Sequence, residues 1–385
     1  MIESVVIGGG LAGCAAAITL ARHGHQVALI EAGTYPRAKV CGEFLSPECV
    51  TLFKNMGFLE RLHSLNPTTI RTVRITSPTS EWRGRFPAPA VGISRYALDA
   101  ALADYAEACG VMVMNGTRVT DISGGFSAGF TLTTQTAHET RALEASSVIA
   151  AHGKRSNLDR VLKRAFFGQP QPYIGLKQHF RGAALPEHID LHVFRGGYCG
   201  VSQVEDGRTN VCLMVEQKVF QEVTVGAPDA IARFIAWMSA ENRQLGAWLA
   251  DAEPLYPDWL SIAQVTLAPK TPLEGDILCA GDAAGMVAPL AGDGMAMALH
   301  SGVLAAESVR EYLTHQTDAA VMKAGYADKW QRTFATRLRL GRALQSLMLK
   351  PAILTPGLRV MRAFPVVGNW LVANTRDMRL ARRTI

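Results

Sequence analysis

The stretch Val5-Val6-Ile7-Gly8-Gly9-Gly10-Leu11-Ala12-Gly13 decides the fold of this chain. Three apolar residues of high strand propensity lead into the spacing Gly8-x-Gly10-x-x-Gly13, and a helical pattern follows at once. In a dinucleotide-binding unit the first glycine permits the tight turn, the second lets the backbone approach a pyrophosphate, and the third lets the helix pack close to the strand. The N–H groups at the helix start, near Leu11 and Ala12, would then face the phosphates.

An acidic residue after the next strand supports the same interpretation. The second apolar run spans residues 26–31, and Glu31 falls 18 residues after Gly13, where an acceptor for a ribose hydroxyl is expected. The alternative is an ordinary glycine-rich turn in an α/β protein, and the position of Glu31 argues against it. We therefore predict a bound adenine dinucleotide.

The composition predicts a globular protein with a well-buried core. The chain has 385 residues, of which 48% are hydrophobic and 19% charged, enough for two closely joined domains. The first strand begins at the N-terminus, so we expect no signal peptide, and no apolar run reaches the roughly 18 residues of a membrane span. Seven cysteines without CxxC pairs indicate a reducing cytoplasm, no disulfide framework and no metal site.

The net charge of +6 is concentrated at the C-terminal end. Residues 332–385 hold eleven Lys and Arg against one acid, Asp377. Such a basic, apolar-rich segment could contact an anionic membrane surface, an acidic carrier protein or a phosphorylated substrate, and the alternative is a solvated helix face. The docking hypothesis rests on Arg359, Arg362, Arg376 and Arg379, with Arg382 and Arg383 beyond them.

Pattern changes along the chain predict an interleaved domain organisation. Strands are expected over 67–91 with a break at Phe86-Pro87-Ala88-Pro89, and strands dominate again from Tyr173 to Val215. Helices are expected from Arg95 to about Cys109, from Met295 to about Tyr312, over 319–349 and over 358–385. We assign 1–66, 92–160 and 270–310 to one α/β domain, 67–91 and 161–269 to a substrate domain, and 311–385 to a helical C-terminal segment.

The order of several motifs resembles a known flavoprotein superfamily. Gly8–Gly13, the helix that starts at Arg95, the turn over 151–156, and Gly281-Asp282 followed by Pro289 and Gly292–Gly294 together resemble the aromatic hydroxylases and geranylgeranyl reductases. The resemblance covers about residues 1–310. It implies an α/β fold, with a Rossmann-like FAD-binding domain, an interleaved sheet-containing substrate domain and FAD as cofactor, with NAD(P)H as a candidate reductant.

The same resemblance implies a set of cofactor-binding residues. Asp282 would hold the ribityl chain, and the helix start near Gly294 would face the flavin pyrimidine edge, where its dipole stabilises the negative charge of reduced flavin. Arg95 matches an arginine placed near the cofactor, and Lys39 lies in a loop expected to cross it. The predicted set is Gly8, Gly10, Leu11, Ala12, Gly13, Glu31, Lys39, Arg95, Asp282, Pro289, Gly292, Gly294 and Met295.

Two features bear on the branch of the superfamily. The loop Lys39-Val40-Cys41-Gly42-Glu43 resembles the Cys-Gly element of the geranylgeranyl-reductase branch, which makes Cys41 the candidate catalytic residue beside the flavin. The alternative is a small buried cysteine. His152-Gly153 stands where hydroxylases carry Asp-Gly, so the usual nicotinamide handling is in question. The Trp-x-Trp-x-Ile-Pro signature of flavin-dependent halogenases is absent.

The resemblance implies an FAD-dependent oxidoreductase, and first of all a monooxygenase that hydroxylates or epoxidises an apolar or aromatic small molecule with O₂. The alternatives are a reductase or dehydrogenase acting on carbon–carbon bonds, and a non-catalytic flavin-binding module. We expect no nucleic-acid partner, and we allow a carrier- or lipid-linked substrate and peripheral membrane contact. Five residues in the strand-rich region are candidate pocket residues, although a core or sheet position is the more ordinary interpretation of each: Tyr173, His179, Phe194, Tyr198 and Met214.

Overall fold

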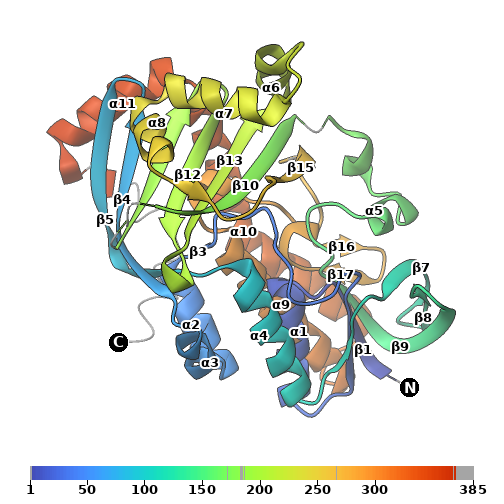
Figure 1. Cartoon of the computed structure of the whole chain (residues 1–385). Coiled ribbons are helices and arrows are strands. Elements are labelled where there is room, and N and C mark those ends of the chain that lie inside the picture. The colour runs from blue at the N-terminus through green and yellow to red at the C-terminus, as the bar shows by residue number, and fades with distance from the viewer. Residues whose placement is uncertain are drawn as a thin grey trace.

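The computed structural model describes residues 2–369 apart from 171, 183–184, 186, 266 and 367, and it consists of two sheets with helices packed around them (Figure 1). The two sheets lie side by side in Figure 1. Helices α1 and α9 pack beside the sheet that contains β1, and they lie below the other sheet in this view. Helices of the chain are α1 (Leu11–Arg22), α2 (Pro47–Met56), α3 (Leu59–Ser64), α4 (Arg95–Ala108), α5 (Asn157–Val161), α6 (Gln217–Thr224), α7 (Ala230–Glu241), α8 (Arg243–Ala250), α9 (Gly294–Leu313), α10 (Ala319–Met348) and α11 (Pro351–Ala363).

The first sheet carries the N-terminal glycine turn at the end of its central strand. Its strands are β1 (Ile2–Ile7), β2 (Val27–Ile30), β6 (Met112–Met114), β7 (Arg118–Gly125), β8 (Gly129–Gln135), β9 (Thr140–Ala150), β16 (Leu273–Glu274) and β17 (Ile277–Cys279). The order is β16-β17-β9-β1-β2-β6, with β1 parallel to β2 and β9, while β7 and β8 form a hairpin beside β9. Buried on both faces, β1 and β2 read as continuous apolar runs. Their carboxyl ends, and the turns that follow them, therefore meet at one edge.

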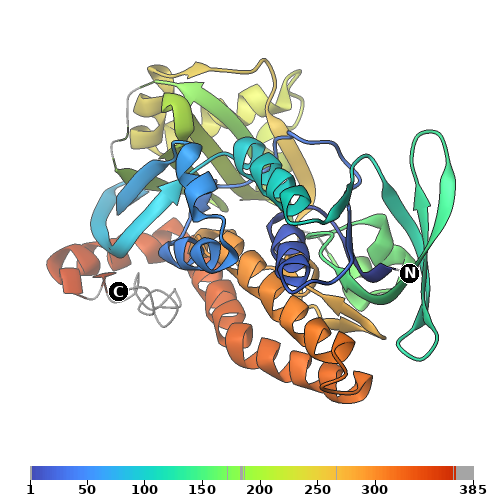
Figure 2. The same ribbon diagram turned by 90° about the horizontal axis from the view of Figure 1, so that it is seen from below.

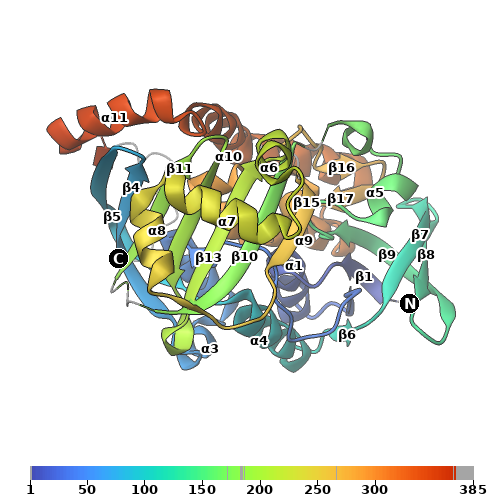
Figure 3. The same cartoon turned by 45° about the horizontal axis from the view of Figure 1, so that its top comes forward.

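The second sheet is mostly antiparallel and separates two cores. Its strands are β3 (Phe44–Leu45), β4 (Thr68–Ser77), β5 (Ser80–Gly92), β10 (Tyr173–Arg181), β11 (His188–Phe194), β12 (Gly197–Gln203), β13 (Thr209–Glu216), β14 (Glu253–Pro254) and β15 (Leu260–Val265). The order is β14-β10-β13-β12-β11-β4-β5-β3, and β15 also pairs with β10. Helices α6, α7 and α8 cover one face (Figure 3), where Phe194 packs with Phe234. Tyr198 and Met214 belong to the core on the opposite face.

The C-terminal helices complete the fold from the other side. Helix α10 runs alongside α9 (Figure 2), and Tyr326 and Phe334 of α10 are fully buried. Helix α11 then crosses β4 and β5, against which it buries Leu354 and Leu358. The predicted fold class, a Rossmann-like domain with an interleaved sheet-containing domain and a helical C-terminal segment, is confirmed. The exact domain limits stay a prediction.

The predicted strand break at residues 86–89 is wrong. Strand β5 continues through Pro87 and Pro89 to Gly92. Its pairing with β4 jumps from Ile70 opposite Ala90 to Thr72 opposite Arg85, so both prolines lie where the register shifts. A proline has no N–H to give to a ladder, and an irregularity of this kind accommodates it without losing the strand.

The last described helix also differs from the prediction. Helix α11 begins at Pro351, not at 358, and it passes through Pro356. Pro351 occupies the first turn, where its missing N–H costs nothing, and Pro356 forgoes one hydrogen bond that packing of Leu354 and Leu358 offsets. The predicted continuation over 370–385, with Arg376, Arg379, Arg382 and Arg383, lies outside the described residues.

Candidate cofactor and substrate site

A cavity of about 930 Å³ lies between the two sheets. One end is lined by the turn after β1, the end of β2 and the loop that leads to β3. The other end is lined by strands β11, β12, β13 and β15 and by helices α10 and α11. Because the two ends differ in charge and polarity, the cavity divides into a polar arm and an apolar arm.

The glycine turn at the polar arm leaves no room for side chains. Gly8 has φ 101°, and a Cβ there would lie 2.5 Å from the Ala151 carbonyl oxygen. A Cβ on Gly13 would lie 1.8 Å from the Gly8 oxygen, so only glycine lets α1 start this close to β1. Leu11 and Ala12 form the first turn of α1, and both line the cavity. Their N–H groups are the positive end of the helix dipole.

Two cations share one carboxylate beside this turn. Arg95 donates to both Asp99 oxygens at 2.6 and 2.8 Å, and Lys39 Nζ lies 2.8 Å from Asp99 Oδ2. Burial and the nearby charge of Arg95 lower the pKa of Lys39. A Cβ on Gly10 would lie 3.6 Å from Lys39 Nζ and 3.7 Å from the Arg95 guanidinium. The space over Gly10 is therefore bounded by excess positive charge, which suits a pyrophosphate.

Glu31 lines the cavity, and the residue is only 4% exposed. Its carboxylate accepts hydrogen bonds from the Gly9 and Gly33 N–H groups at 2.9 and 2.8 Å, and it pairs with Arg37 at 2.7 Å. These contacts hold Glu31 against the glycine turn, at the carboxyl end of β2. Its assignment to a ribose hydroxyl stays a prediction.

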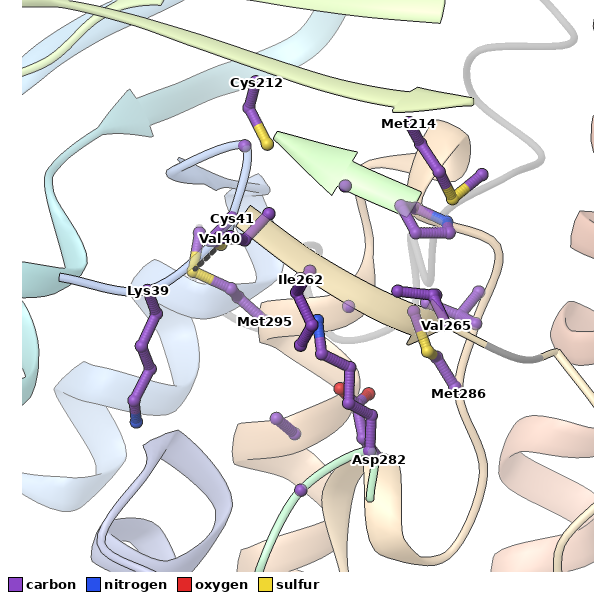
Figure 4. Close-up of a pocket in the computed structure, with 18 of the residues that line it drawn as sticks. Lys39, Val40, Cys41, Cys212, Met214, Ile262, Val265, Asp282, Met286 and Met295 are labelled. Atoms are coloured by element: carbon purple, nitrogen blue, oxygen red, sulfur yellow. Dashed lines mark hydrogen bonds between the residues drawn. The ribbon is translucent and has the colours of Figure 1, made fainter. Parts of the chain in front are cut away.

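Asp282 enters the same cavity from a turn far along the chain. Gly281, with φ 62°, places this turn against α1, and Lys270 Nζ donates to the Asp282 backbone oxygen at 2.7 Å. Among the described residues, none donates a hydrogen bond to the Asp282 carboxylate, which lines the cavity (Figure 4). The carboxylate is thus available to accept hydrogen bonds from ligand hydroxyls.

The start of helix α9 faces the cavity at the junction of its two arms. Pro289, Gly292, Gly294 and Met295 all line it, and Gly292 has φ 65°, which permits the turn into the helix. The positive end of the α9 dipole therefore points toward the ligand space. An anionic ring system placed there gains favourable charge interaction.

Cys41 lies directly against this helix start. Its Sγ is 3.9 Å from Met295 Sδ, and it accepts a hydrogen bond from the Glu43 N–H at 3.4 Å (Figure 4). The Cys41 backbone oxygen accepts from Asn210 Nδ2 at 3.1 Å, which ties this loop to β13. Arg95 lies beside the thiol. Cys41 is thus brought together with the predicted cofactor residues, on the side that adjoins the apolar arm.

Sequence reasoning missed the role of Glu43, which is fully buried and has φ 53°. Its carboxylate accepts from His179 Nε2 at 2.6 Å, from the Arg95 N–H at 2.7 Å and from Lys177 Nζ. Burial alone would raise the pKa of Glu43, but the His179 hydrogen bond and the Lys177 charge outweigh it and lower the pKa. Lys177 and His179 stand two residues apart on an apolar strand, so they share a face. That pairing is the signal the sequence offered.

His152 is held in a separate polar network at the end of β9. Its Nε2 lies 2.9 Å from Asp159 Oδ1, and Asp159 also accepts from the Ser156 N–H at 2.7 Å and from Arg164 at 3.2 Å. Burial would raise the pKa of Asp159, but the hydrogen bond with His152 lowers it. His152 also lines the cavity, and its contact with Asp159 links the end of β9 to α5.

The apolar arm contains only two of the five candidate pocket residues. Tyr198 and Met214 line it, whereas Tyr173, His179 and Phe194 do not. His179 bonds Glu43, and Phe194 points into the core under α7. The arm is built instead from aliphatic and thioether side chains of both sheets and of the C-terminal helices: Val73, Ile75, Ile189, Leu191, Ile262, Val265, Met286, Leu290, Leu344, Leu347, Met348, Ile353, Leu354, Leu358 and Met361.

The chemistry of these lining residues fits FAD. The space over Gly10, between Lys39 and Arg95, would suit a pyrophosphate, and the Asp282 carboxylate could accept hydrogen bonds from hydroxyls. The α9 start favours the anionic edge of a reduced isoalloxazine. The individual residue assignments stay predictions.

Comparison with known proteins gives the same answer. The family model described as FAD binding domain matches residues 1–332. A menaquinone reductase of Mycolicibacterium smegmatis is 27% identical over 381 residues, covering 91% of this chain and 86% of that protein.

Solved structures share the fold. The Pseudomonas aeruginosa protein PqsL in complex with 2-aminobenzoylacetate is 17% identical, with a TM-score of 0.75 over 93% of this chain and 99% of that one. The flavin-dependent halogenase CmlS is 23% identical, with a TM-score of 0.75 over 87% of this chain and 62% of that one. With the family model matching most of its length, this chain belongs to the FAD-binding domain family of flavin-dependent oxidoreductases.

Proposed function

We propose that this FAD-dependent oxidoreductase is a reductase that saturates a carbon–carbon double bond in an elongated apolar substrate. The observation that carries the proposal is the position of Cys41 in a cavity whose second arm is long and apolar. The thiol contacts Met295 at the cofactor end, and the arm continues from there to Leu347 and Ile353 on the C-terminal helices. An aliphatic lining that reaches from Met295 to the C-terminal helices suits an apolar chain better than a compact polar ring.

The reaction needs two electrons and two hydrogens. Reduced FAD supplies a hydride, and the second hydrogen must arrive as a proton at the neighbouring carbon. Cys41 is the proton donor in this proposal, because its Sγ lies in the cavity at the junction of the two arms. The resulting thiolate lies beside Arg95 and regains its proton from solvent.

The sequence relatives support this order of preference, which reverses the one drawn from the sequence. The menaquinone reductase matches 91% of this chain at 27% identity, whereas the likeness to PqsL and CmlS shows the fold alone. NAD(P)H as the source of electrons, a lipid- or carrier-linked substrate and a cytoplasmic location remain proposals. In the described part of the chain, no helix is long and apolar enough to cross a bilayer.

Monooxygenation remains the second candidate, because the apolar walls of the second arm are equally consistent with it. Met214, Val265 and Met286 gather on the side of the cavity away from Lys39 (Figure 4). Such walls exclude water, and both oxygen insertion and hydride transfer require that exclusion. No feature of the described residues specifically supports the third alternative, a flavin-binding module without activity.

Oxygen dependence separates the two reactions. Enzyme holding chemically reduced FAD is mixed anaerobically with a prenylated naphthoquinone in detergent, and flavin reoxidation and product mass are followed. A reductase of this kind reoxidises its flavin without oxygen, and its product stays two mass units heavier after the ring is reoxidised in air, because the hydrogens lie on the side chain. A product that returns to the starting mass in air is only the quinol, and it would contradict saturation of a carbon–carbon double bond. Reoxidation only after admission of ¹⁸O₂, with the label in the product, would establish a monooxygenase. Adding NADH or NADPH to oxidised enzyme, and following loss of flavin colour, tests the electron source.

A further inference from the structure

Exposed apolar side chains gather on one part of the surface. Among the described residues, twelve large hydrophobic side chains are exposed, and six of them fall within 340–366. These six define an apolar face on the end of α10, on α11 and just beyond it: Leu340, Leu347, Ile353, Val360, Phe364 and Val366. Monomeric proteins rarely cluster such residues without a partner.

Exposed basic residues are interspersed among the residues of the apolar face. Arg339, Lys350, Arg359 and Arg362 are all exposed, and residues 329–366 contain no acid. Within the described part of the chain, no carboxylate pairs with Lys350, Arg359 or Arg362. Among the described residues their charges have no counter-ion, and they suit an anionic surface.

The substrate cavity reaches the surface at this face. Leu347 and Ile353 both line the cavity, and they are 49% and 47% exposed, so they form its rim at the turn between α10 and α11. On the inner side of α11, Leu354 and Leu358 are buried against β4 and β5 (Figure 3). Helix α11 thus has one apolar side that packs on the sheet and another, at Val360 and Phe364, that is open.

We propose that the apolar face docks on an anionic phospholipid bilayer, so that the apolar arm of the cavity opens into the lipid phase. Val360 and Phe364 enter the acyl-chain boundary, and Lys350, Arg359 and Arg362 contact the headgroups. An apolar substrate then passes from membrane to cavity without crossing water. Docking itself is independent of the reaction, and only this substrate route rests on the proposed function.

The test is co-sedimentation of the full-length protein with vesicles, measured without substrate. Phosphatidylcholine vesicles are compared with vesicles that also contain phosphatidylglycerol, from low to high salt. We expect binding to the anionic vesicles only, falling as salt screens the charges. Because no turnover is involved, failure of the proposed reaction would not affect this result.

Two sets of variants separate docking from cavity lining. Val360→Ser with Phe364→Ser removes apolar side chains that do not line the cavity, and the matched control is Val225→Ser with Val321→Ser, which are 82% and 61% exposed elsewhere. Replacing Lys350, Arg359 and Arg362 with Gln removes three charges. Its control makes the same three changes at Arg83, Arg141 and Lys218.

Each basic residue at an anionic leaflet contributes about fivefold to partitioning, so the charge variant should bind roughly 100-fold more weakly. The serine variant should also lose binding, and both controls should behave as the parent does. Equal binding to neutral and anionic vesicles, equal loss in the controls, or no binding by the parent would overturn the proposal. So would a dimer in light scattering that the serine variant dissociates, because a second copy would then cover the face.

Discussion

Cys41 Sγ lies 3.9 Å from Met295 Sδ, and this contact joins two segments that are 254 residues apart. One is the loop that leads from the first sheet into the second, and the other is the start of helix α9. The two arms of the cavity meet at this contact. A thiol placed there adjoins the cofactor space on one side and the substrate space on the other.

Cys41→Ser should keep FAD and lower turnover. Serine has nearly the same size as cysteine, but its hydroxyl is a far weaker acid than a thiol. Proton donation therefore slows while the cofactor contacts remain. We expect roughly a 10²- to 10⁴-fold fall in kcat, with unchanged flavin content. Cys109→Ser is the matched control, since that cysteine is also half-buried but does not line the cavity. Equal turnover and product for Cys41→Ser and parent would leave Cys41 as a packing residue.

Asp282→Ala should release FAD from an otherwise folded protein. A carboxylate that accepts hydrogen bonds from ligand hydroxyls contributes about 1.5–3 kcal/mol, or roughly 10- to 100-fold in affinity. Glu31→Ala should weaken binding less, because ribose hydroxyls can turn to water. Fluorescence titration of the apoprotein with FAD measures both. Asp104→Ala, exposed on α4, is the control, and an unchanged Kd for Asp282→Ala would remove this residue from the site.

Glu43→Gln should destabilise the protein by about 3–5 kcal/mol, because Lys177 loses its buried counter-charge. The pKa of Glu43 is held below its usual value of 4.5, so its stabilising effect is complete above that value and is lost as pH falls through the lower, folded-state pKa. Urea unfolding at several pH values should show this acid-side loss in the parent and not in the variant. Glu187→Gln removes an exposed ion pair with Arg71 and should cost less than 1 kcal/mol. Similar costs for the two variants would contradict the prediction.

The site residues that the sequence predicted have partners nearby in the chain, whereas the residue that the sequence did not reveal has partners far along the chain. The glycine turn and Glu31 fall within one strand–helix–strand unit, so local chemistry is enough to place them. Glu43 meets Lys177 and His179 across separations of 134 and 136 residues, which depend on how the two sheets pack. No local pattern encodes that distance.

Prolines are a second case in which a local sequence pattern did not predict the structure. Pro87, Pro89 and Pro356 each predict an interruption, because proline lacks an N–H. The structure absorbs the first two where the β4–β5 register shifts, and the third within a helix anchored by Leu354 and Leu358. In both places tertiary packing outweighs a local preference, so strand and helix continue.

The cation pair at the glycine turn yields the last prediction. Lys39 and Arg95 share Asp99, which leaves one positive charge in excess beside Gly10. Burial and Arg95 already lower the pKa of Lys39, so a bound anion relieves an unfavourable charge, and removal of Lys39 forfeits that gain.

Lys39→Met should therefore weaken FAD binding by about tenfold, which corresponds to roughly 1.4 kcal/mol. It should also make the dissociation constant less sensitive to salt, because fewer charges face the pyrophosphate. Lys323→Met is the matched control: its side chain is 28% exposed, against 26% for Lys39, and it also pairs with a single aspartate, Asp276, but away from the cavity. FAD titrations of both variants from low to high salt measure the effect. If Lys39→Met binds FAD with the parent's affinity and salt slope, the phosphates do not lie over Gly10, and the cofactor must enter the cavity in another orientation.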